Sequence, residues 1–394
     1  MKPLAMSLSI SLLLILPIFC PSFAQEFPSD RECGSDLSNL WLDVVVVVDN
    51  SVGMTNDGLI QVAAQIVSVF SAGTRIGTNY ADKRTTRVGL VTYNEVATIK
   101  ANLSVFQSSS DLFASVFDNL QEVSTSDTVY LAKGLEAAEK VLAEGRNNNI
   151  RANYKQLVII YASDYNDEGM EDPRPTADRL KASGVNIATV SFDQTGNEGV
   201  SDKLGEISTP SFNFSNKDNN LVREIQTAMI QTNCYCSNLW HQYRDDYDDQ
   251  KSYKYGVCLM PVAITAAWAP ARLSCQNMIK AGYMVTEYNE KKHNYVFRMI
   301  QNNTAFREPY IYHIGLSNVN GGYFWQQPAG SPLVPLDDVL WNPGFPQQPA
   351  SNTGVVNQQQ SSAFKIGWQN INQYTVAEKY VCEVASCDTD KYCE

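Results

Sequence analysis

The stretch that decides the fold of the first part of the chain is LDVVVVVDNSVGM, residues 42–54. Its five consecutive valines, Val44 to Val48, leave no polar face. A strand without a polar face is typical of a parallel sheet that is covered by helices on both sides. The stretch therefore predicts that an α/β domain begins here, with strands and helices in alternation.

The rest of the first half supplies those strands and helices in order. Branched residues concentrate in three further runs, Arg87 to Tyr93, Gln156 to Ala162 and Val185 to Phe192. Apolar residues recur at helical spacing in four segments: Gly58 to Ala72, Tyr130 to Glu144, Pro175 to Ser183 and Asn220 to Ile230. This alternation predicts a doubly wound α/β sheet over residues 37–232.

Polar side chains follow two of the predicted strands directly. Asp49 and Ser51 come after the valine strand, and Asp164 comes after the strand that ends at Ala162. In sheets of this kind ligands bind beyond the carboxyl ends of the strands. Two carboxylates and a hydroxyl would suit a hard divalent cation there. The alternative is that Asp49 and Ser51 simply end the strand, with Asp164 solvated nearby.

Four segments in this order resemble a von Willebrand factor type A domain. They are LDVVVVVDNSVGM (42–54), RVGLVTYNEVATIKANL (87–103), YLAKGLEAAEKVL (130–142) and QLVIIYASD (156–164). The resemblance implies a metal site for adhesion, built from an Asp-x-Ser-x-Ser loop, a threonine of a second loop and an aspartate of a third.

The chain matches that metal motif only in part. Asp49, Ser51 and Asp164 match, but Gly53 stands in place of the second serine. The family alignment puts Val129 at the threonine position, with Thr128 one residue away. The resemblance thus allows at most a weakly bound Mg²⁺, with water replacing the lost ligands.

Beyond Cys234 the composition shifts to Trp, Tyr, Asn, Gln and Pro, and cysteines concentrate. This pattern predicts a second, loop-rich domain over residues 236–394 that disulfides hold together. Helical spacing of apolar residues is clear in one segment only, Pro270 to Ala281, where the proline lies in the first turn.

Short motifs along this second half resemble, in their order, an α+β C-type lectin-like domain. They are Cys236 with Trp240, YGVC (255–258), the segment from Trp268 to Cys275, HIGL (313–316), Phe324-Trp325, LWN (340–342) and YVCE (380–383). Calcium-dependent sugar binding in this family uses a Glu-Pro-Asn or Gln-Pro-Asp triplet and a Trp-Asn-Asp triplet.

Both sugar-binding triplets are altered here, to Gln348-Pro349-Ala350 and Trp368-Gln369-Asn370. Because a calcium site needs six to eight oxygens with anionic charge among them, we expect binding largely independent of calcium. Aromatic and amide side chains could bind a sugar or a protein instead. Trp325, Trp341 and Trp368 occupy positions where the fold uses core aromatics. The remaining candidates for ligand binding are Phe345, Gln347, Gln348 and Asn370.

The chain has nine cysteines, and eight remain once Cys20 is removed with the export signal. Eight cysteines permit 105 connectivities, so the sequence alone leaves the pairing open. The lectin resemblance implies Cys275 with Cys382 and Cys236 with Cys258. Cys33 and Cys234 flank the first domain, whose ends are expected to lie close together. Cys387 and Cys393 are left to close a short loop.

The N-terminus predicts export. Lys2 precedes an apolar run from Leu8 to Ile18, too short to span a membrane, and Ser22-Phe23-Ala24 is a cleavage pattern. We expect a signal peptide at 1–24, a short segment at 25–36 and a secreted, extracellular product. Three acceptor triplets for N-linked glycans, at Asn102, Asn213 and Asn302, fit that compartment. The net charge of −12 argues against nucleic acid and anionic membrane partners.

No pattern in the sequence predicts catalysis. There is no Gly-x-Ser-x-Gly motif, and the three histidines lie outside the first domain and away from zinc-ligand spacing. The two domains together resemble secreted lectin-like proteins of nematodes, which implies extracellular recognition in innate defence. The leading hypothesis is a protein that binds glycan or protein surfaces. The alternative is a structural or matrix adhesion protein that uses the degenerate metal site of the first domain.

Overall fold

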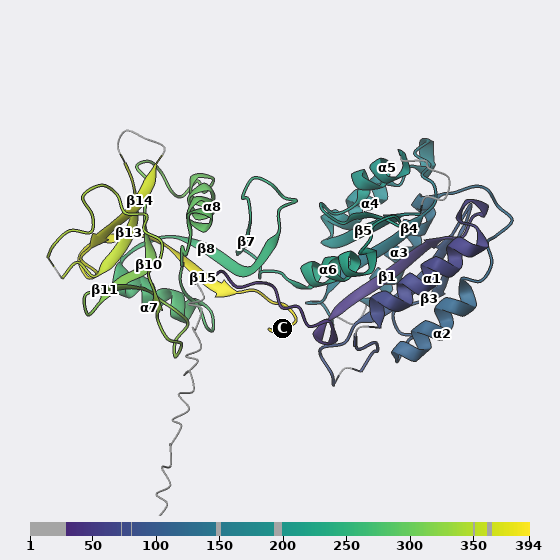
Figure 1. The fold of residues 1–394 in the computed structure, drawn as a ribbon, viewed down its shortest axis with the longest axis horizontal. Helices are drawn as coiled ribbons and strands as arrows, with labels where there is room; N and C mark the ends of the chain where they lie inside the picture. The colour runs from purple at the N-terminus through teal and green to yellow at the C-terminus, as the bar shows by residue number, and fades with distance from the viewer. Residues whose placement is uncertain are drawn as a thin grey trace, which may run out of the picture.

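The structure, a computed structural model, describes residues 29–71, 73–79, 81–146, 151–192, 199–349, 351–360 and 365–394. The expected signal peptide at 1–24 lies outside the described residues. Figure 1 shows two domains side by side, the first in purple to teal and the second in green to yellow. Within the described part of the chain, no helix combines the length and the apolar character needed to cross a bilayer.

The first domain is built on a six-stranded sheet in the order β3-β2-β1-β4-β5-β6. Its strands are β1 (Leu42–Asp49), β2 (Arg87–Tyr93), β3 (Ala97–Ala101), β4 (Lys155–Ala162), β5 (Val185–Ser191) and β6 (Asn213–Ser215). All neighbours pair in parallel except β3, which runs antiparallel to β2. The valine strand β1 lies inside the sheet, and all eight of its residues are buried.

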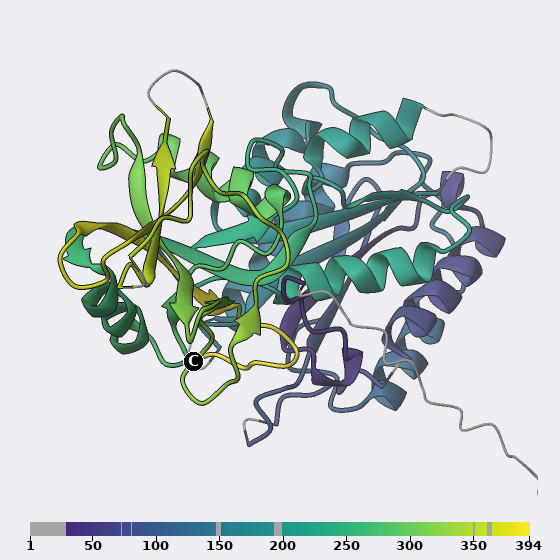
Figure 2. The same ribbon diagram turned by 60° about the vertical axis from the view of Figure 1, so that its left-hand side comes forward.

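Helices cover both faces of this sheet, as the two views together show (Figures 1 and 2). They are α1 (Asn56–Phe70), α2 (Ser109–Asn119), α3 (Leu131–Gly145), α4 (Arg174–Ala182), α5 (Gly199–Ile207) and α6 (Leu221–Asn233). Val44, Val46 and Val48 pack with α1, α2 and α6, whereas Val45 and Val47 pack with α3 on the opposite face. The strand thus needs apolar side chains on both sides.

The predicted doubly wound α/β architecture is confirmed, and the four predicted helices correspond to α1, α3, α4 and α6. Helices α2 and α5 and strands β3 and β6 were not predicted. Strand β6 has three residues, and β3 exposes three of its five, so neither carries a long buried run. Only their position at the edges of the sheet gives them partners.

The second domain is a mainly antiparallel sheet with two helices. Its strands are β7 (His241–Arg244), β8 (Lys254–Ala267), β9 (Tyr283–Met284), β10 (Ile311–Val319), β11 (Gly322–Trp325), β12 (Val334–Pro335), β13 (Gly354–Gln359), β14 (Ile366–Ile371) and β15 (Ala377–Ala385). The main path is β12-β11-β10-β15-β8-β7, and β13 and β14 extend from β10. Strand β15 at the C-terminus pairs with β8 over most of its length.

The expectation of one helix in this domain was wrong. Helix α7 (Trp268–Met278) corresponds to the predicted segment, but a second helix, α8, spans Glu290–Gln301. Two polar residues, Lys292 and His293, lie on the buried side of α8 together with Val296 and Ile300. Buried polar side chains interrupt the apolar spacing from which the sequence analysis identified helices.

The structure forms four disulfides, and their pairing is the expected one: Cys33–Cys234, Cys236–Cys258, Cys275–Cys382 and Cys387–Cys393. The Cys275–Cys382 bond joins α7 to β15 inside the second domain. The Cys33–Cys234 bond closes the first domain at its two ends.

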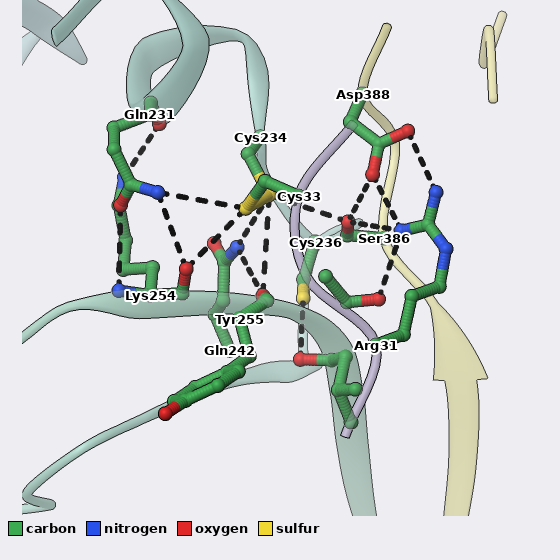
Figure 3. The surroundings of a disulfide bond; sticks show 12 residues. Arg31, Cys33, Gln231, Cys234, Cys236, Gln242, Lys254, Tyr255, Ser386 and Asp388 are labelled. Atoms are coloured by element: carbon green, nitrogen blue, oxygen red, sulfur yellow. Dashed lines mark hydrogen bonds and ion pairs between the residues drawn. A yellow bond between two sulfur atoms is a disulfide. The ribbon is translucent and has the colours of Figure 1, made fainter. Parts of the chain in front are cut away.

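The two ends of the described chain cross over between the domains. Residues before the first domain contact the second: the backbone carbonyl of Arg31 accepts from Gly256, and its guanidinium binds Asp388 next to the Cys33–Cys234 bond (Figure 3). Residues beyond β15, at the C-terminal end of the second domain, contact the first: the indole of Trp41 donates to the Asp388 carbonyl at 3.1 Å. The N-terminal segment is therefore bonded to the second domain, and the C-terminal segment is bonded to the first.

Candidate functional site

Asp49 lies at the carboxyl end of β1 and is fully buried. One carboxylate oxygen accepts from the backbone of Ser51 at 2.8 Å, and the other accepts from both the backbone and the hydroxyl of Ser163. Burial raises the pKa of Asp49, although these hydrogen bonds act in the opposite direction. The Ser51 hydroxyl is buried beside it without a hydrogen bond of normal geometry among the described residues.

Asp164 and Thr128, the other expected ligands, make hydrogen bonds with their own sequence neighbours. Asp164 is exposed, and its carboxylate accepts from the backbone of the next residue, Tyr165, at 2.8 Å. Thr128 is half-buried and faces Asp127, with 3.5 Å between the hydroxyl and carboxylate oxygens. Val129, at the position that the family alignment gives to threonine, packs into the apolar core of α3.

Tyr93 is a residue of this region that the sequence analysis did not single out. It ends β2, pairs in register with Asp49, and is completely buried. Its hydroxyl has no hydrogen bond within the described part of the chain. Burial, reinforced by the charges of Asp49 and Asp164, raises the pKa of Tyr93, so its ring stays a neutral phenol.

The first-domain residues do not fit the metal set that the family resemblance implies. Both carboxylate oxygens of Asp49 already accept hydrogen bonds from Ser51 and Ser163, and Gly53 and Val129 have no side-chain oxygen that could bind a metal ion. In the ranges that the structure describes, no three His, Cys, Asp or Glu side chains are grouped in a way that could hold a metal ion. A divalent cation would have to compete with the three hydrogen bonds that Asp49 already accepts.

In the second domain, Asn370 of the second altered triplet is also bonded internally. The Asn370 amide accepts from the backbone of Gln347 and donates to the carbonyl of the same residue, both at 2.7 Å. Asn370 is 4% exposed. We therefore correct its expected role: it holds the loop that carries Gln347 and does not face a ligand. Phe345 is half-buried, and Gln347 and Gln348 are exposed.

The three tryptophans that were expected to lie in the core are buried to different degrees. Trp325 and Trp368 are 1% and 0% exposed and pack edge to face at 5.4 Å between ring centroids. Trp341 is half-buried and packs against Trp368 at 5.8 Å. These rings support the loop from within and leave little surface for stacking a ligand.

A buried polar network that the sequence did not reveal lies beneath the same loop. The Glu287 carboxylate, fully buried, bonds His293 Nδ1 at 2.8 Å, Trp368 Nε1 at 2.9 Å and Asn357 Nδ2 at 2.7 Å. The start of α8 with the loop before it, β13 and β14 meet at this one carboxylate. Because buried charges are costly unless paired, this network links α8 firmly to β13 and β14.

The pair of His293 and Glu287 makes stability depend on pH. Burial alone would lower the pKa of His293, but the charge and hydrogen bond of Glu287 outweigh it and raise that pKa above its ordinary value. The stabilisation is then complete below the unfolded-state pKa of about 6.5 and is lost as pH rises through the folded-state pKa. We expect the free energy of unfolding to fall above about pH 6.5.

The test is urea unfolding of the chain and of His293→Gln from pH 5.5 to 9, followed by tryptophan fluorescence. The variant should be less stable by about 3 kcal/mol at the acid end, where the pair is intact, and should vary less with pH. Parallel pH profiles of the two proteins would contradict this assignment.

The three glycan acceptor asparagines, Asn102, Asn213 and Asn302, are all exposed. Asn213 lies on the edge strand β6, where its amide nitrogen donates to the Ser201 carbonyl at 3.0 Å and its oxygen accepts from Thr189. Glycosylation at these positions remains a prediction.

Comparison with known proteins bears on both halves. A model of the von Willebrand factor type A domain matches residues 43–228. C-type lectin domain-containing protein 160 of Caenorhabditis elegans is 28% identical over 380 residues, which cover 92% of this chain and 56% of that protein. The chain thus spans a little over half the length of this relative.

Several solved structures are similar to part of this chain. Proximal thread matrix protein 1 from the mussel byssus, with a zinc occupied MIDAS motif, is 16% identical with a TM-score of 0.43, over 54% of this chain and 52% of that chain. Human lithostathine is 20% identical with a TM-score of 0.30, over 38% and 99%. A calcium-independent type II antifreeze protein is 18% identical with a TM-score of 0.29, over 39% and 96%.

Domains of these two kinds are typically binding modules without catalysis. For the first half, the von Willebrand factor type A assignment agrees with the sheet order, the two helical layers and the matched residues. For the second half, the C-type lectin-like assignment agrees with the name of the relative and with the antiparallel α+β sheet. The chain carries a von Willebrand factor type A domain at residues 43–228, followed by a C-type lectin-like domain.

Proposed function

We propose that this protein is a secreted, extracellular recognition protein that binds glycan or protein surfaces through its lectin-like domain, largely without calcium, in an innate-immune-type role. The observation that carries the proposal is the internal bonding of Asn370 with Gln347. In this family the triplet that includes the Asn370 position would share its oxygens between calcium and sugar. Here those amide groups hold the loop, and exposed Gln348 and half-buried Phe345 remain for contact.

The alternative, adhesion through the metal site of the first domain, has less support. Asp49 is buried and already accepts three hydrogen bonds, and Asp164 bonds its own neighbour. An anionic oxygen that is already satisfied gives a cation little extra stabilisation.

Retention on immobilised microbial cell walls tests this proposal. We expect the full chain to be retained to within about twofold with EDTA and with added Ca²⁺, since uncharged contacts need no ion. Pull-down and quantitation of the bound fraction measure this. Loss of retention in EDTA that calcium or magnesium restores would contradict it.

Two variants connect retention to the loop. Phe345→Ala with Gln348→Ala removes the accessible aromatic and amide contacts and should lower retention several-fold. Ile264→Ala is the matched control, because the Ile264 side chain lies on the exposed face of β8 at 74% exposure. This variant should be retained on the cell walls as fully as the unchanged chain. Equal retention of all three proteins would remove the loop from the binding surface.

A further inference from the structure

A cavity of about 380 Å³ opens on the lectin-like domain, and no residue of either altered triplet is among its described lining residues. It lies where the first turns of α7, the end of β10, the residue before β13 and the turn between β14 and β15 meet. Trp268, Arg272, Asn320, Thr353, Gln373 and Tyr374 are among its lining residues. Its volume falls within the range of sites for small ligands.

Arg272 gives this cavity its charge. Among the described residues, its guanidinium makes no ion pair or hydrogen bond, and its Nε atom is buried. None of the described residues that line the cavity is acidic. A buried guanidinium nitrogen without an acceptor is costly, and a bound anion would remove that cost.

The other lining residues of the cavity could contact a sugar ring. Tyr374 is 71% exposed at the rim and can stack on the apolar face of a sugar. The Thr353 hydroxyl is buried and has no partner within the described ranges. The side-chain amides of Asn320 and Gln373 make no hydrogen bond to any residue that the structure describes. Hydroxyl, amide and aromatic groups beside one arginine favour a saccharide over an acidic peptide.

We propose that this cavity binds an anionic saccharide, with Arg272 holding its carboxylate or sulfate group and Tyr374 stacking on its ring. The inference rests on the proposed function and names its ligand class. Arg272 acts as a bidentate donor, which lysine cannot reproduce. The contact needs no metal ion.

The test measures binding of the full chain, in EDTA, to four immobilised probes by biolayer interferometry: polygalacturonate, dextran sulfate, neutral dextran and poly-L-glutamate. We expect binding to polygalacturonate, dextran sulfate or both, with the preferred polymer distinguishing carboxylate from sulfate. Arg272→Gln should weaken it about tenfold or more, because charge-assisted hydrogen bonds are lost. Arg272→Lys should recover only part of the affinity, and Tyr374→Ala should weaken binding without changing the charge.

Arg307→Gln is the matched control. Arg307 is exposed in the same domain and makes no ion pair or hydrogen bond with a described residue, and its replacement by glutamine removes one positive charge, as Arg272→Gln does. It should change affinity within about twofold. Thermal unfolding of each variant confirms that the domain is folded.

Three results would overturn the inference: no binding to either acidic polysaccharide, equal loss for Arg272→Gln and Arg307→Gln, or poly-L-glutamate binding as tightly as the saccharides. In each case EDTA-resistant retention on cell walls would leave the proposed function standing. Loss of that retention in EDTA would instead remove the proposed function itself.

Discussion

Replacing Lys292 with alanine is expected to destabilise the second domain by about 3–5 kcal/mol. The Lys292 side chain is 0% exposed, and its Nζ atom lies 2.6 Å from Asp30 Oδ1 and 3.0 Å from Glu383 Oε2. Both carboxylates are buried as well. Without the ammonium group, two buried negative charges would face each other uncompensated.

The charge state of Lys292 supports this expectation. Burial opposes its charge, but Asp30 and Glu383 outweigh burial and raise the pKa of Lys292. The cation is therefore present at neutral pH. Asp30 precedes the first domain, so the variant should also loosen the N-terminal segment.

Chemical unfolding followed by tryptophan fluorescence measures the change in stability. Lys291→Ala is the matched control, since the neighbouring Lys291 pairs with Asp245 at the surface. Exposed pairs of this kind contribute up to about 1 kcal/mol. A Lys292→Ala variant no less stable than Lys291→Ala would show that the buried triad contributes little.

Replacing Cys33 and Cys234 with serine should destabilise the protein by about 5 kcal/mol in the chain-entropy model. The bond joins residues 201 positions apart and encloses the whole first domain. Its loss frees a long loop in the unfolded chain and releases the segment that carries Asp30 and Arg31. Unfolding midpoints in urea, and faster proteolysis before residue 37, would report both effects.

The Cys387–Cys393 bond provides the comparison. It joins residues six positions apart, so its removal should cost roughly 2 kcal/mol in the same model. Equal destabilisation by the two double-serine variants would contradict an origin in loop closure and would point to local packing at each bond.

Much of the first domain could be predicted because its signals are local. The valine run of β1 needs cover on both faces, and the apolar spacing of α1 and α3 is regular. Short edge elements such as β6 carry no such signal, since pairing with β5 makes β6 a strand. In the second domain α8 stayed hidden, because Lys292 and His293 are polar in sequence and buried in the fold.

The candidate sites, too, could be predicted from the sequence only in part. The sequence located Asp49, Ser51 and Asp164 near one edge of the sheet, and it identified the loss of acidic residues from the lectin triplets. It could not reveal that Asn370 turns inward to Gln347, or that Arg272, Thr353 and Tyr374 line one cavity. Residues that are distant along the chain become neighbours only through the sheet and its turns.

The sequence by itself determined the two domain types, their order and the missing metal ligands, because these depend on residue identity and local spacing. Only the tertiary structure decided which polar groups satisfy one another and which stay open to a ligand. Hydrogen bonds and ion pairs depend on distances of about 3 Å between distant segments, and no local pattern encodes such distances.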